Sequence, residues 1–266
     1  MTILIERRLG TAPFWMPVES GWVEPGVPVE IVESPSASDV RSHQGLAIVD
    51  SLLATPALEQ SVILRDFAVA ADQISLLTMV TAERPDEITR ATVATPGVSL
   101  SGRALAEIVI PTFYGIEISG WTDEAAEVGP ESILITEDAD ALLPSIDEEH
   151  YHEDLGRAWF LLTDTPFVSH VCIAPAAMVT DNRDELVVQV RALRTCLEAA
   201  DKQRRMLRRN ISRDHGIDRE LVVDVYDGLR FELSDAATQG LITLYHRAGV
   251  LRRTGPIDER IIRLLS

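Results

Sequence analysis

Strand-like and helix-like segments alternate through the middle of this sequence. The run "ATVAT" (residues 91–95) predicts a strand, "PGVSLSG" a turn, and "RALAEIVIPTF" (residues 103–113) an amphipathic helix. The same order returns in "SILITEDADALLP", where residues 132–135 predict a buried strand and residues 138–143 a short helix. Such alternation is typical of α/β layers built around a mostly parallel sheet.

The segments on either side have a different pattern. Before residue 84, apolar runs separated by glycine and proline predict several strands, one of them confined to Val29–Val32. After Thr180, leucine and valine at helical spacing predict one long amphipathic helix, and two more follow over residues 218–233 and 234–251. A chain of 266 residues therefore fits one large domain or two interleaved lobes.

The charge balance and the cysteine count exclude several classes of protein. The 42 acidic and 24 basic residues give a net charge of −18, which argues against a nucleic-acid surface because phosphate binding needs concentrated positive charge. Only Cys172 and Cys196 are present, which excludes a disulfide framework and a cysteine-rich zinc site. The opening "MTILIERRLGTAPFW" has too short an apolar run for a signal peptide, and no uncharged run reaches membrane-spanning length. We therefore expect a cytoplasmic protein that binds neither nucleic acid nor membrane.

The turn "PGVSLSG" has the composition of an anion-binding site. It places Ser99, Ser101 and Gly102 where a strand is followed by a helix, so that free backbone N–H groups and two hydroxyls point the same way. These groups suit a carboxylate or a phosphate. The alternative is that Ser101 only caps its own helix.

Two acidic stretches could carry other chemistry, but an ordinary structural role is favoured for each. In "DEEHYHEDLG", His150, His152 and Asp154 are conceivable metal ligands, yet Asp154 is better explained as a helix N-cap, and we expect no metal. Asp138 and Asp140 could form an acid and base pair, but residues two apart on a helix do not face each other.

The one basic block is "KQRRMLRRNISR", residues 202–213. It ends the long predicted helix, where positive charge is favoured by the helix dipole, and the rest of the chain is strongly acidic. The block is therefore interpreted as a solvated helix end. The sequence has no P-loop, no GxGxxG, no GxSxG and no Cys and His nucleophile pattern.

Several stretches together resemble one family of enzymes. The longest is "DLGRAWFLLTDTPFVSHV" (residues 154–171), and it is joined by "GTAPFW", "GLAIVDSLLA", "VATPGVSLSGRALAEIV" and "SILITEDADALL", in the same order as in that family. They resemble the menaquinone-biosynthesis enzymes of the futalosine route. The closing helices are also similar, so the resemblance covers nearly the whole chain. It is closer to chorismate dehydratase than to 1,4-dihydroxy-6-naphthoate synthase.

The resemblance implies a two-lobed α/β fold of the periplasmic-binding-protein type (type II), with the ligand in an interlobe cleft. Carried over to this chain, residues 1–84 and 180–266 would form lobe one, and residues 85–179 would form lobe two. The chain would cross between lobes near residues 84–88 and again near 174–180.

The resemblance also implies the residues of the site, which would hold a small carboxylate. They are Gly10, Thr11 and Ser51 from lobe one, and Ser99, Ser101, Gly102 and Thr136 from lobe two. No metal or redox cofactor is implied, since loss of water from chorismate is driven by formation of an aromatic ring. The sequence leaves the catalytic base unassigned, and Thr11 is the candidate for a catalytic donor.

This chain departs from the family at positions near the implied site. Gly10 stands where the family has an Asn associated with catalysis in the dehydratase, and Glu137 stands where it has Gly. Gly102 replaces the last Ser of the turn, Asp164 replaces a Gly, and Cys172 replaces a Trp. Two functions therefore remain open. One is a carbon–oxygen lyase of the chorismate dehydratase kind with weak or absent activity, and the other is a non-catalytic cytoplasmic protein that binds a small carboxylate. A third alternative is an unrelated α/β protein.

Overall fold

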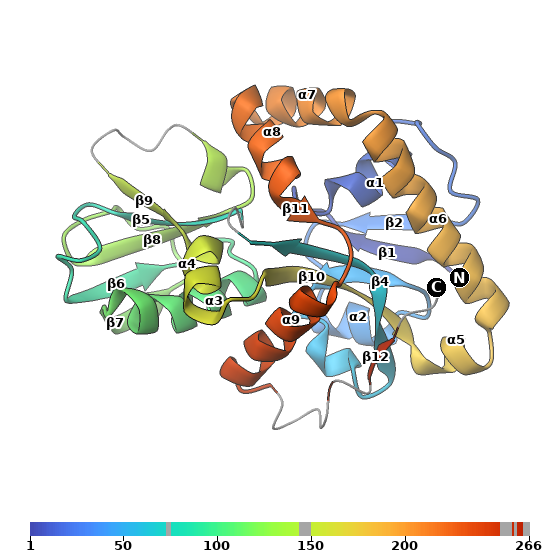
Figure 1. Cartoon of the computed structure of the whole chain (residues 1–266), viewed down its shortest axis with the longest axis horizontal. Coiled ribbons are helices and arrows are strands. Elements are labelled where there is room, and N and C mark those ends of the chain that lie inside the picture. Colours follow the sequence, from blue (N-terminus) through green and yellow to red (C-terminus); the bar gives the residue numbers. More distant parts are fainter. Residues whose placement is uncertain (73–75, 144–149, 251–256, 258–259, 263–266) are drawn as a thin grey trace.

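The chain forms two lobes, each built around its own β-sheet (Figure 1). The computed structural model describes residues 1–72, 76–143, 150–250, 257 and 260–262. The larger lobe contains both ends of the described chain, and the smaller lobe is formed by its middle part. The two-lobed prediction is confirmed.

The larger lobe has a mixed sheet in the order β11-β4-β10-β3-β1-β2, with β12 beside β4. Its strands are β1 (Ile3–Glu6), β2 (Val29–Val32), β3 (Ala47–Asp50), β4 (Ser61–Ala71), β10 (Phe167–Pro175), β11 (Leu229–Arg230) and β12 (Ile261–Ile262). Strand β1 is parallel to β2 and β3, whereas β10 is antiparallel to β3 and β4.

Helices cover both faces of this sheet. They are α1 (Ala12–Glu19), α2 (Ala37–Ser42), α5 (Ala176–Thr180), α6 (Arg183–Lys202), α7 (Arg204–His215), α8 (Arg219–Gly228) and α9 (Asp235–Arg247). Successive side chains of a strand point to opposite faces of the sheet. Ile3 and Ile5 therefore pack on the face that α1 and α6 cover, and Leu4 packs on the face that α2 and α9 cover. Ser234 caps α9 by accepting a hydrogen bond from the Ala237 N–H, which confirms the predicted start of that helix.

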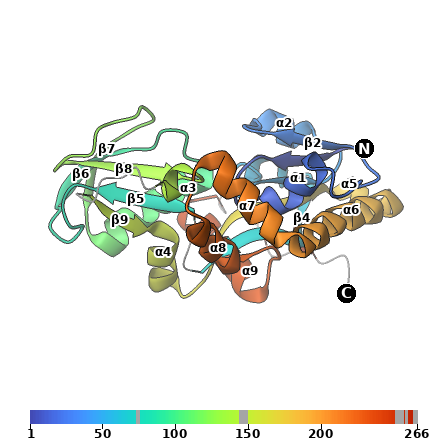
Figure 2. The same ribbon diagram turned by 90° about the horizontal axis from the view of Figure 1, so that it is seen from above.

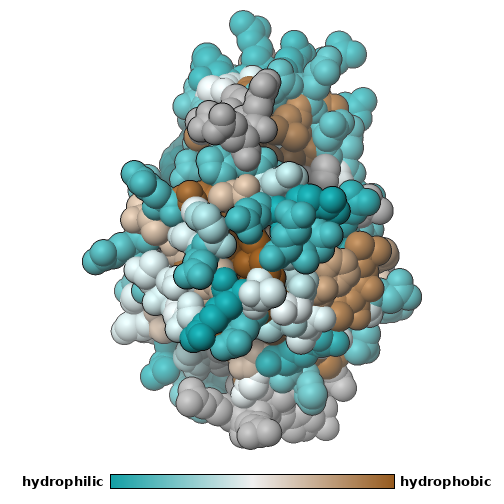
Figure 3. All heavy atoms as spheres, turned by 90° about the vertical axis from the view of Figure 1, so that its left-hand side faces the viewer, coloured by the Kyte–Doolittle hydropathy of each residue, from teal (hydrophilic) through white to brown (hydrophobic). Residues whose placement is uncertain are grey.

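The smaller lobe has a five-stranded sheet in the order β7-β6-β8-β5-β9. Its elements are β5 (Leu77–Thr81), β6 (Arg90–Ala94), α3 (Leu100–Val109), β7 (Glu117–Thr122), β8 (Ser132–Glu137), β9 (Tyr151–Asp154) and α4 (Leu155–Thr163). Helices α3 and α4 pack together over one face, with Leu105, Val109 and Trp159 buried between them and the sheet. Hydrophilic side chains cover most of the outer end of this lobe (Figure 3).

Both sheets differ from the mostly parallel sheet that the sequence predicts. In the larger lobe β10 enters antiparallel between β3 and β4, and in the smaller lobe β5 is antiparallel to β8 and β9. These strands lie where the chain passes from one lobe to the other rather than inside a strand-helix-strand unit, so local alternation does not reveal their direction.

The chain moves from one sheet to the other earlier than predicted at both points. Strand β4 ends at Ala71 and β5 already belongs to the second sheet from Leu77. On the return, β9 ends at Asp154 and β10 joins the first sheet from Phe167. The predicted divisions at residues 84/85 and 179/180 therefore do not coincide with the change of sheet.

Two helical predictions are corrected by the structure. The single long helix after Thr180 is divided at Gln203 into α6 and α7, and the short helix over 138–143 is a 3-10 turn at Asp140–Leu142. The "GTAPFW" stretch begins helix α1, which tolerates Pro13 because an N–H in the first turn has no intrahelical carbonyl to donate to, so that its absence in proline costs no hydrogen bond. No helix in the described ranges is both long enough and apolar enough to traverse a lipid bilayer.

Candidate functional site

Polar side chains from both lobes meet where three strands end. Glu6 ends β1, Asp50 ends β3 and Glu137 ends β8, and all three face the region around the N-terminus of α3. In open α/β sheets ligands bind outside the carboxyl ends of the strands. This interlobe region is therefore the candidate site.

The N-terminus of α3 already binds carboxylates, and both belong to the chain itself. Glu137 accepts hydrogen bonds from the Ser99 backbone N–H (2.5 Å) and the Ser99 hydroxyl (2.8 Å). Asp50 accepts one from the Ser101 backbone N–H (3.0 Å). The Ser99 hydroxyl also accepts the Gly102 N–H and so caps the helix. In this conformation two carboxyl groups of the chain itself occupy the position at the start of α3 where the sequence predicts a ligand anion.

Asp50 also connects the two lobes. Its other oxygen accepts the backbone N–H groups of Leu52 (2.9 Å) and Leu53 (2.8 Å) in its own lobe. The Leu52 N–H is shared with the hydroxyl of Ser101, at 3.0 Å, on the other lobe. The lobes are thus held together at the start of α3 by one carboxylate and one hydroxyl, both buried.

A single guanidinium lies among three carboxyl groups in this region. The Arg8 side chain is 3.3 Å from a Glu6 oxygen, 3.3 Å from an Asp138 oxygen and 4.0 Å from a Glu137 oxygen. The Leu9 N–H donates to the second Asp138 oxygen at 3.0 Å. With Asp50, we call Glu6, Arg8, Glu137 and Asp138 the interlobe cluster.

Burial favours the protonated form of several acids in the interlobe cluster. It raises the pKa of Glu137 to about 8, and the neighbouring Asp138 carboxylate adds to the shift. Burial also raises the pKa of Glu6 and of Asp50 above their ordinary values. Since one guanidinium cannot neutralise four carboxylates, the cluster holds protons at neutral pH.

His170 on β10 lies against the interlobe cluster and was not singled out by sequence reasoning. Its Nε2 is 3.9 Å from a Glu6 oxygen and has no hydrogen-bond partner among the described residues. Its Nδ1 is 3.0 Å from the Ser169 hydroxyl. Burial lowers the pKa of His170 to about 4, so the ring is neutral at pH 7. Only the register of β10 beside β3, which pairs His170 with Asp50, brings it here.

The remaining predicted residues are close to the cluster, but the hydroxyls of Thr11 and Ser51 are used in hydrogen bonds to backbone carbonyls. Thr11 is buried and donates to the Glu6 carbonyl at 2.6 Å, and Ser51 donates to the Val168 carbonyl at 2.8 Å. The hydroxyl of Thr136 is buried without a partner in the described chain. Gly10 is buried with an ordinary backbone φ, and a Cβ there would lie 3.2 Å from a Val69 methyl.

An open pocket adjoins the interlobe cluster and receives residues from both lobes. Its volume is about 330 Å³, within the usual range for small ligands. The lining residues are Arg7, Arg8, Leu9, Trp15, Glu33, Ser34, Gly97, Asp138, Ala139 and His215. None of the seven predicted site residues lines it. We call it the cleft pocket.

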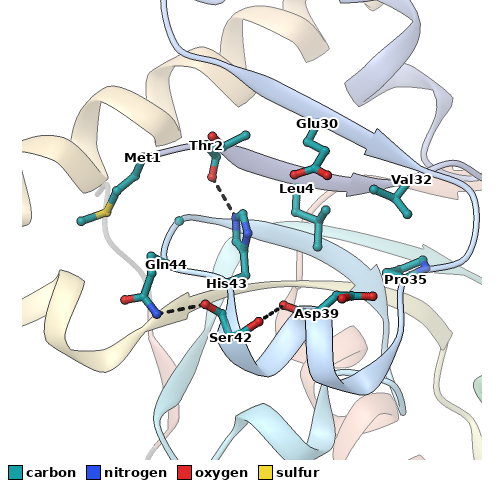
Figure 4. A pocket seen from close by; sticks show the side chains of 11 residues that line it. Met1, Thr2, Leu4, Glu30, Val32, Pro35, Asp39, Ser42, His43 and Gln44 are labelled. Atoms are coloured by element: carbon teal, nitrogen blue, oxygen red, sulfur yellow. Dashed lines mark hydrogen bonds between the residues drawn. The ribbon is translucent and has the colours of Figure 1, made fainter.

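A larger pocket of about 600 Å³ lies at the other edge of the first sheet, where β1 and β2 begin. In Figure 4, His43 Nε2 approaches the Thr2 carbonyl at 2.8 Å and the Gln44 amide donates to the Ser42 carbonyl at 3.0 Å. These polar groups satisfy one another. No buried acid or base faces this pocket, so it is a weaker candidate than the cleft pocket.

The acidic stretches have structural roles. Asp154 accepts the Arg157 N–H at 2.8 Å and caps α4, as predicted, and His152 lies on strand β9. No three His, Cys, Asp or Glu side chains are arranged to hold a metal ion in the part of the chain that the structure describes. Asp138 belongs to the interlobe cluster, whereas Asp140 is exposed.

The sequence of the chain matches one family model. The model is described as menaquinone biosynthesis and matches residues 44–249, more than half of the chain. The chain belongs to this menaquinone biosynthesis family. No curated protein sequence matches it.

Solved structures with the same fold share little sequence with this chain. Protein AF1704 from Archaeoglobus fulgidus is 13% identical with a TM-score of 0.68, covering 93% of this chain and 96% of that chain. The periplasmic aliphatic sulphonate binding protein SsuA from Escherichia coli is 12% identical with a TM-score of 0.68, covering 100% and 94%. The CA3427 gene product of Candida albicans, which has the generic periplasmic binding protein fold, is 12% identical with a TM-score of 0.61, covering 100% and 97%. The fold of this chain is therefore the two-lobed periplasmic-binding-protein fold.

Proposed function

We propose that this member of the menaquinone biosynthesis family is a cytoplasmic carbon–oxygen lyase of the chorismate dehydratase kind. Its substrate is a small cyclic carboxylate bound in the cleft pocket between the lobes. The observation that carries the proposal is the position of Asp138, which both lines this pocket and belongs to the proton-holding interlobe cluster.

The lining of the cleft pocket suits a cyclic anion. Arg7 and His215 contribute basic groups, and Trp15 offers an aromatic face with the Arg7 guanidinium 4.4 Å from its ring centre. A carboxylate is attracted to the two basic groups while a ring packs against the indole. The sulphonate-binding protein with the same fold is consistent with a small anion between the lobes.

The interlobe cluster can supply the proton transfers that loss of water requires. The Asp138 carboxylate, held by the Leu9 N–H and Arg8, accepts a proton from the substrate ring. The C–O bond then breaks, the ring becomes aromatic, and the hydroxyl leaves as water with a proton that the cluster holds on Glu137. The step consumes no oxidant or reductant, and positioning supplies much of the rate.

Two observations favour the alternative of a protein that binds a small carboxylate without converting it. Gly10 offers no side-chain amide, and the Thr11 hydroxyl is already donated to the Glu6 carbonyl. Asp50 and Glu137 also occupy the amides of α3 that would otherwise hold a ligand carboxylate. These features predict a slow enzyme at most.

Incubation with chorismate, followed by ultraviolet absorbance and mass analysis, tests the proposal. We expect slow loss of water in the unaltered protein and none in Asp138→Asn. Asp140→Asn is the matched control, because it removes an exposed carboxylate two residues away. Chorismate that binds but stays intact in every variant would favour the binding-protein alternative. Absence of both binding and turnover would reject a chorismate-like ligand.

A further inference from the structure

Arginines gather on one surface of the larger lobe, where α7 lies beside α8 (Figures 1 and 2). Five of the twelve residues of α7 are arginine, although the chain as a whole has a net charge of −18. A pocket of about 340 Å³ between the two helices is lined by Arg204, Arg205, Arg208, Arg219, Val223 and Asp227. We call it the arginine pocket.

The positive charge of the arginine pocket is largely unmatched. Arg208 pairs with Asp227. Within the described part of the chain, Arg204, Arg205 and Arg219 form no ion pair. Three guanidiniums therefore line one concavity whose single carboxylate, Asp227, is paired with a fourth, which favours an external anion.

Two of these positive charges also lie at the end of α7 where positive charge is unfavourable. Arg204 and Arg205 are its first two residues, where the helix dipole disfavours positive charge. The N-cap, Gln203, makes no side-chain hydrogen bond to the helix, and the first turn contains no acidic residue. An anion in the pocket would relieve both deficits, since it neutralises the guanidiniums and favours the exposed N–H groups.

An apolar pocket opens directly beside the arginine pocket. Its volume is about 360 Å³, and it shares Arg204, Arg208 and Asp227 with the arginine pocket. The rest of its lining is one exposed carboxylate, Asp201, and a mainly apolar set: Pro13, Leu197, Ala200, Leu207, Tyr226 and Phe231. A ligand could therefore place an apolar body on one side of Arg204 and Arg208 and a negative group on the other.

We propose that the arginine pocket and the adjoining apolar pocket form a second ligand site, separate from the cleft pocket, for a small organic anion. The ligand has a sulfonate, phosphate or carboxylate group at the arginines and a ring or short chain against Leu207 and Phe231. An organic anion fits the two pockets better than an inorganic anion does, because an inorganic ion would leave the apolar pocket filled with water.

Calorimetric titration of the whole chain with 2-naphthalenesulfonate tests this site. Inorganic sulfate and neutral 2-naphthol serve as the two half-ligands. Arg205→Gln with Arg219→Gln removes two positive charges from the pocket. Arg209→Gln with Arg213→Gln is the matched control, because it removes two exposed arginines of α7 that do not line the pocket.

We expect the double variant Arg205→Gln/Arg219→Gln (the pocket pair) to bind 2-naphthalenesulfonate about tenfold or more weakly than the unaltered protein. The double variant Arg209→Gln/Arg213→Gln (the control pair) should bind it about twofold more weakly at most. Both half-ligands should bind more weakly than the whole probe. Equal weakening in the two pairs would mean diffuse attraction to a basic helix and would overturn the proposal. Unchanged binding in the pocket pair would place the probe elsewhere, and sulfate as tight as the probe would remove the role of the apolar pocket. Either result also rejects it.

Discussion

The interlobe cluster contains four carboxyl groups and one guanidinium, whereas the arginine pocket is lined by four guanidiniums and one carboxylate. The first group is buried, and its excess charge is removed by protons and by backbone N–H groups. The second is exposed to water, and its excess charge persists because arginine does not release its proton. An external anion therefore competes with several carboxyl groups of the chain in the cleft but with Asp227 alone among the residues that line the arginine pocket.

The largest effect is expected at Asp50, whose carboxylate joins the lobes. In Asp50→Ala the N–H groups of Leu53 and Ser101 lose their acceptor in a buried setting, and the Leu52 N–H keeps only the Ser101 hydroxyl. We expect a loss of about 2–4 kcal/mol in the free energy of unfolding, measured by chemical denaturation. The exposed Asp140→Ala should change it little. Similar losses in both variants would show that Asp50 does not anchor the lobes.

The next effect tests the missing donor at Gly10. A lost transition-state donor costs about a hundredfold or more in rate, so Gly10→Asn should raise chorismate dehydration by up to about a hundredfold. The backbone at Gly10 is not left-handed, and a new Cβ requires only a small shift of Val69. Steady-state turnover measures the gain. Vigorous turnover by the unaltered protein would contradict this view of Gly10, and a folded Gly10→Asn variant without activity would favour the binding protein.

Protonation of Glu137 should make the stability of the chain depend on pH. The pKa of Glu137 rises from 4.5 to about 8 on folding, so its stabilisation is complete below pH 4.5 and is lost as the pH rises through 8. The free energy of unfolding should fall between pH 5 and pH 9, and we expect this fall to be roughly 2 kcal/mol smaller in Glu137→Gln than in the unaltered protein.

Denaturation at both pH values measures the difference. Glu107→Gln is the matched control, because Glu107 lies on the exposed side of α3 in a surface ion pair with Arg103. If the free energy of unfolding changes by the same amount between pH 5 and pH 9 in Glu137→Gln and in the unaltered protein, the proton is not held on Glu137. The comparison between a protonated cluster and a permanently charged surface would then lose its basis.

Local signals explain the parts of the molecule that the sequence predicted well. The strand, turn and helix around Ser99 depend on neighbouring residues, and the structure has β6, the Ser99 cap and α3 there. Asp154 and Ser234 are N-caps for the same reason. Each of these features depends on residues within about four positions in the chain, which is the range over which spacing carries information.

The occupants of the candidate site could not be predicted in this way. The Ser101 N–H is satisfied by Asp50, 51 positions away, and the Ser99 N–H by Glu137, 38 positions away. His170 reaches Asp50 only through the antiparallel pairing of β10. A helix start rich in hydroxyls predicts that an anion binds there. Whether that anion is a ligand or a side chain depends on contacts between lobes that no local pattern contains.

The smallest effect concerns Tyr226, which lies between the two regions. Its hydroxyl donates to the Leu9 carbonyl at 2.6 Å, while its ring lines the apolar pocket beside the arginines. Tyr226→Phe removes the hydrogen bond and keeps the ring, so we expect a loss of about 1 kcal/mol in the free energy of unfolding and no change in 2-naphthalenesulfonate binding. Tyr151→Phe, at an exposed ring, should alter neither quantity. A large loss of probe affinity in Tyr226→Phe would mean that the hydroxyl, and with it the Leu9 segment that binds Asp138, is coupled to the second site, so the two regions could no longer be treated as independent.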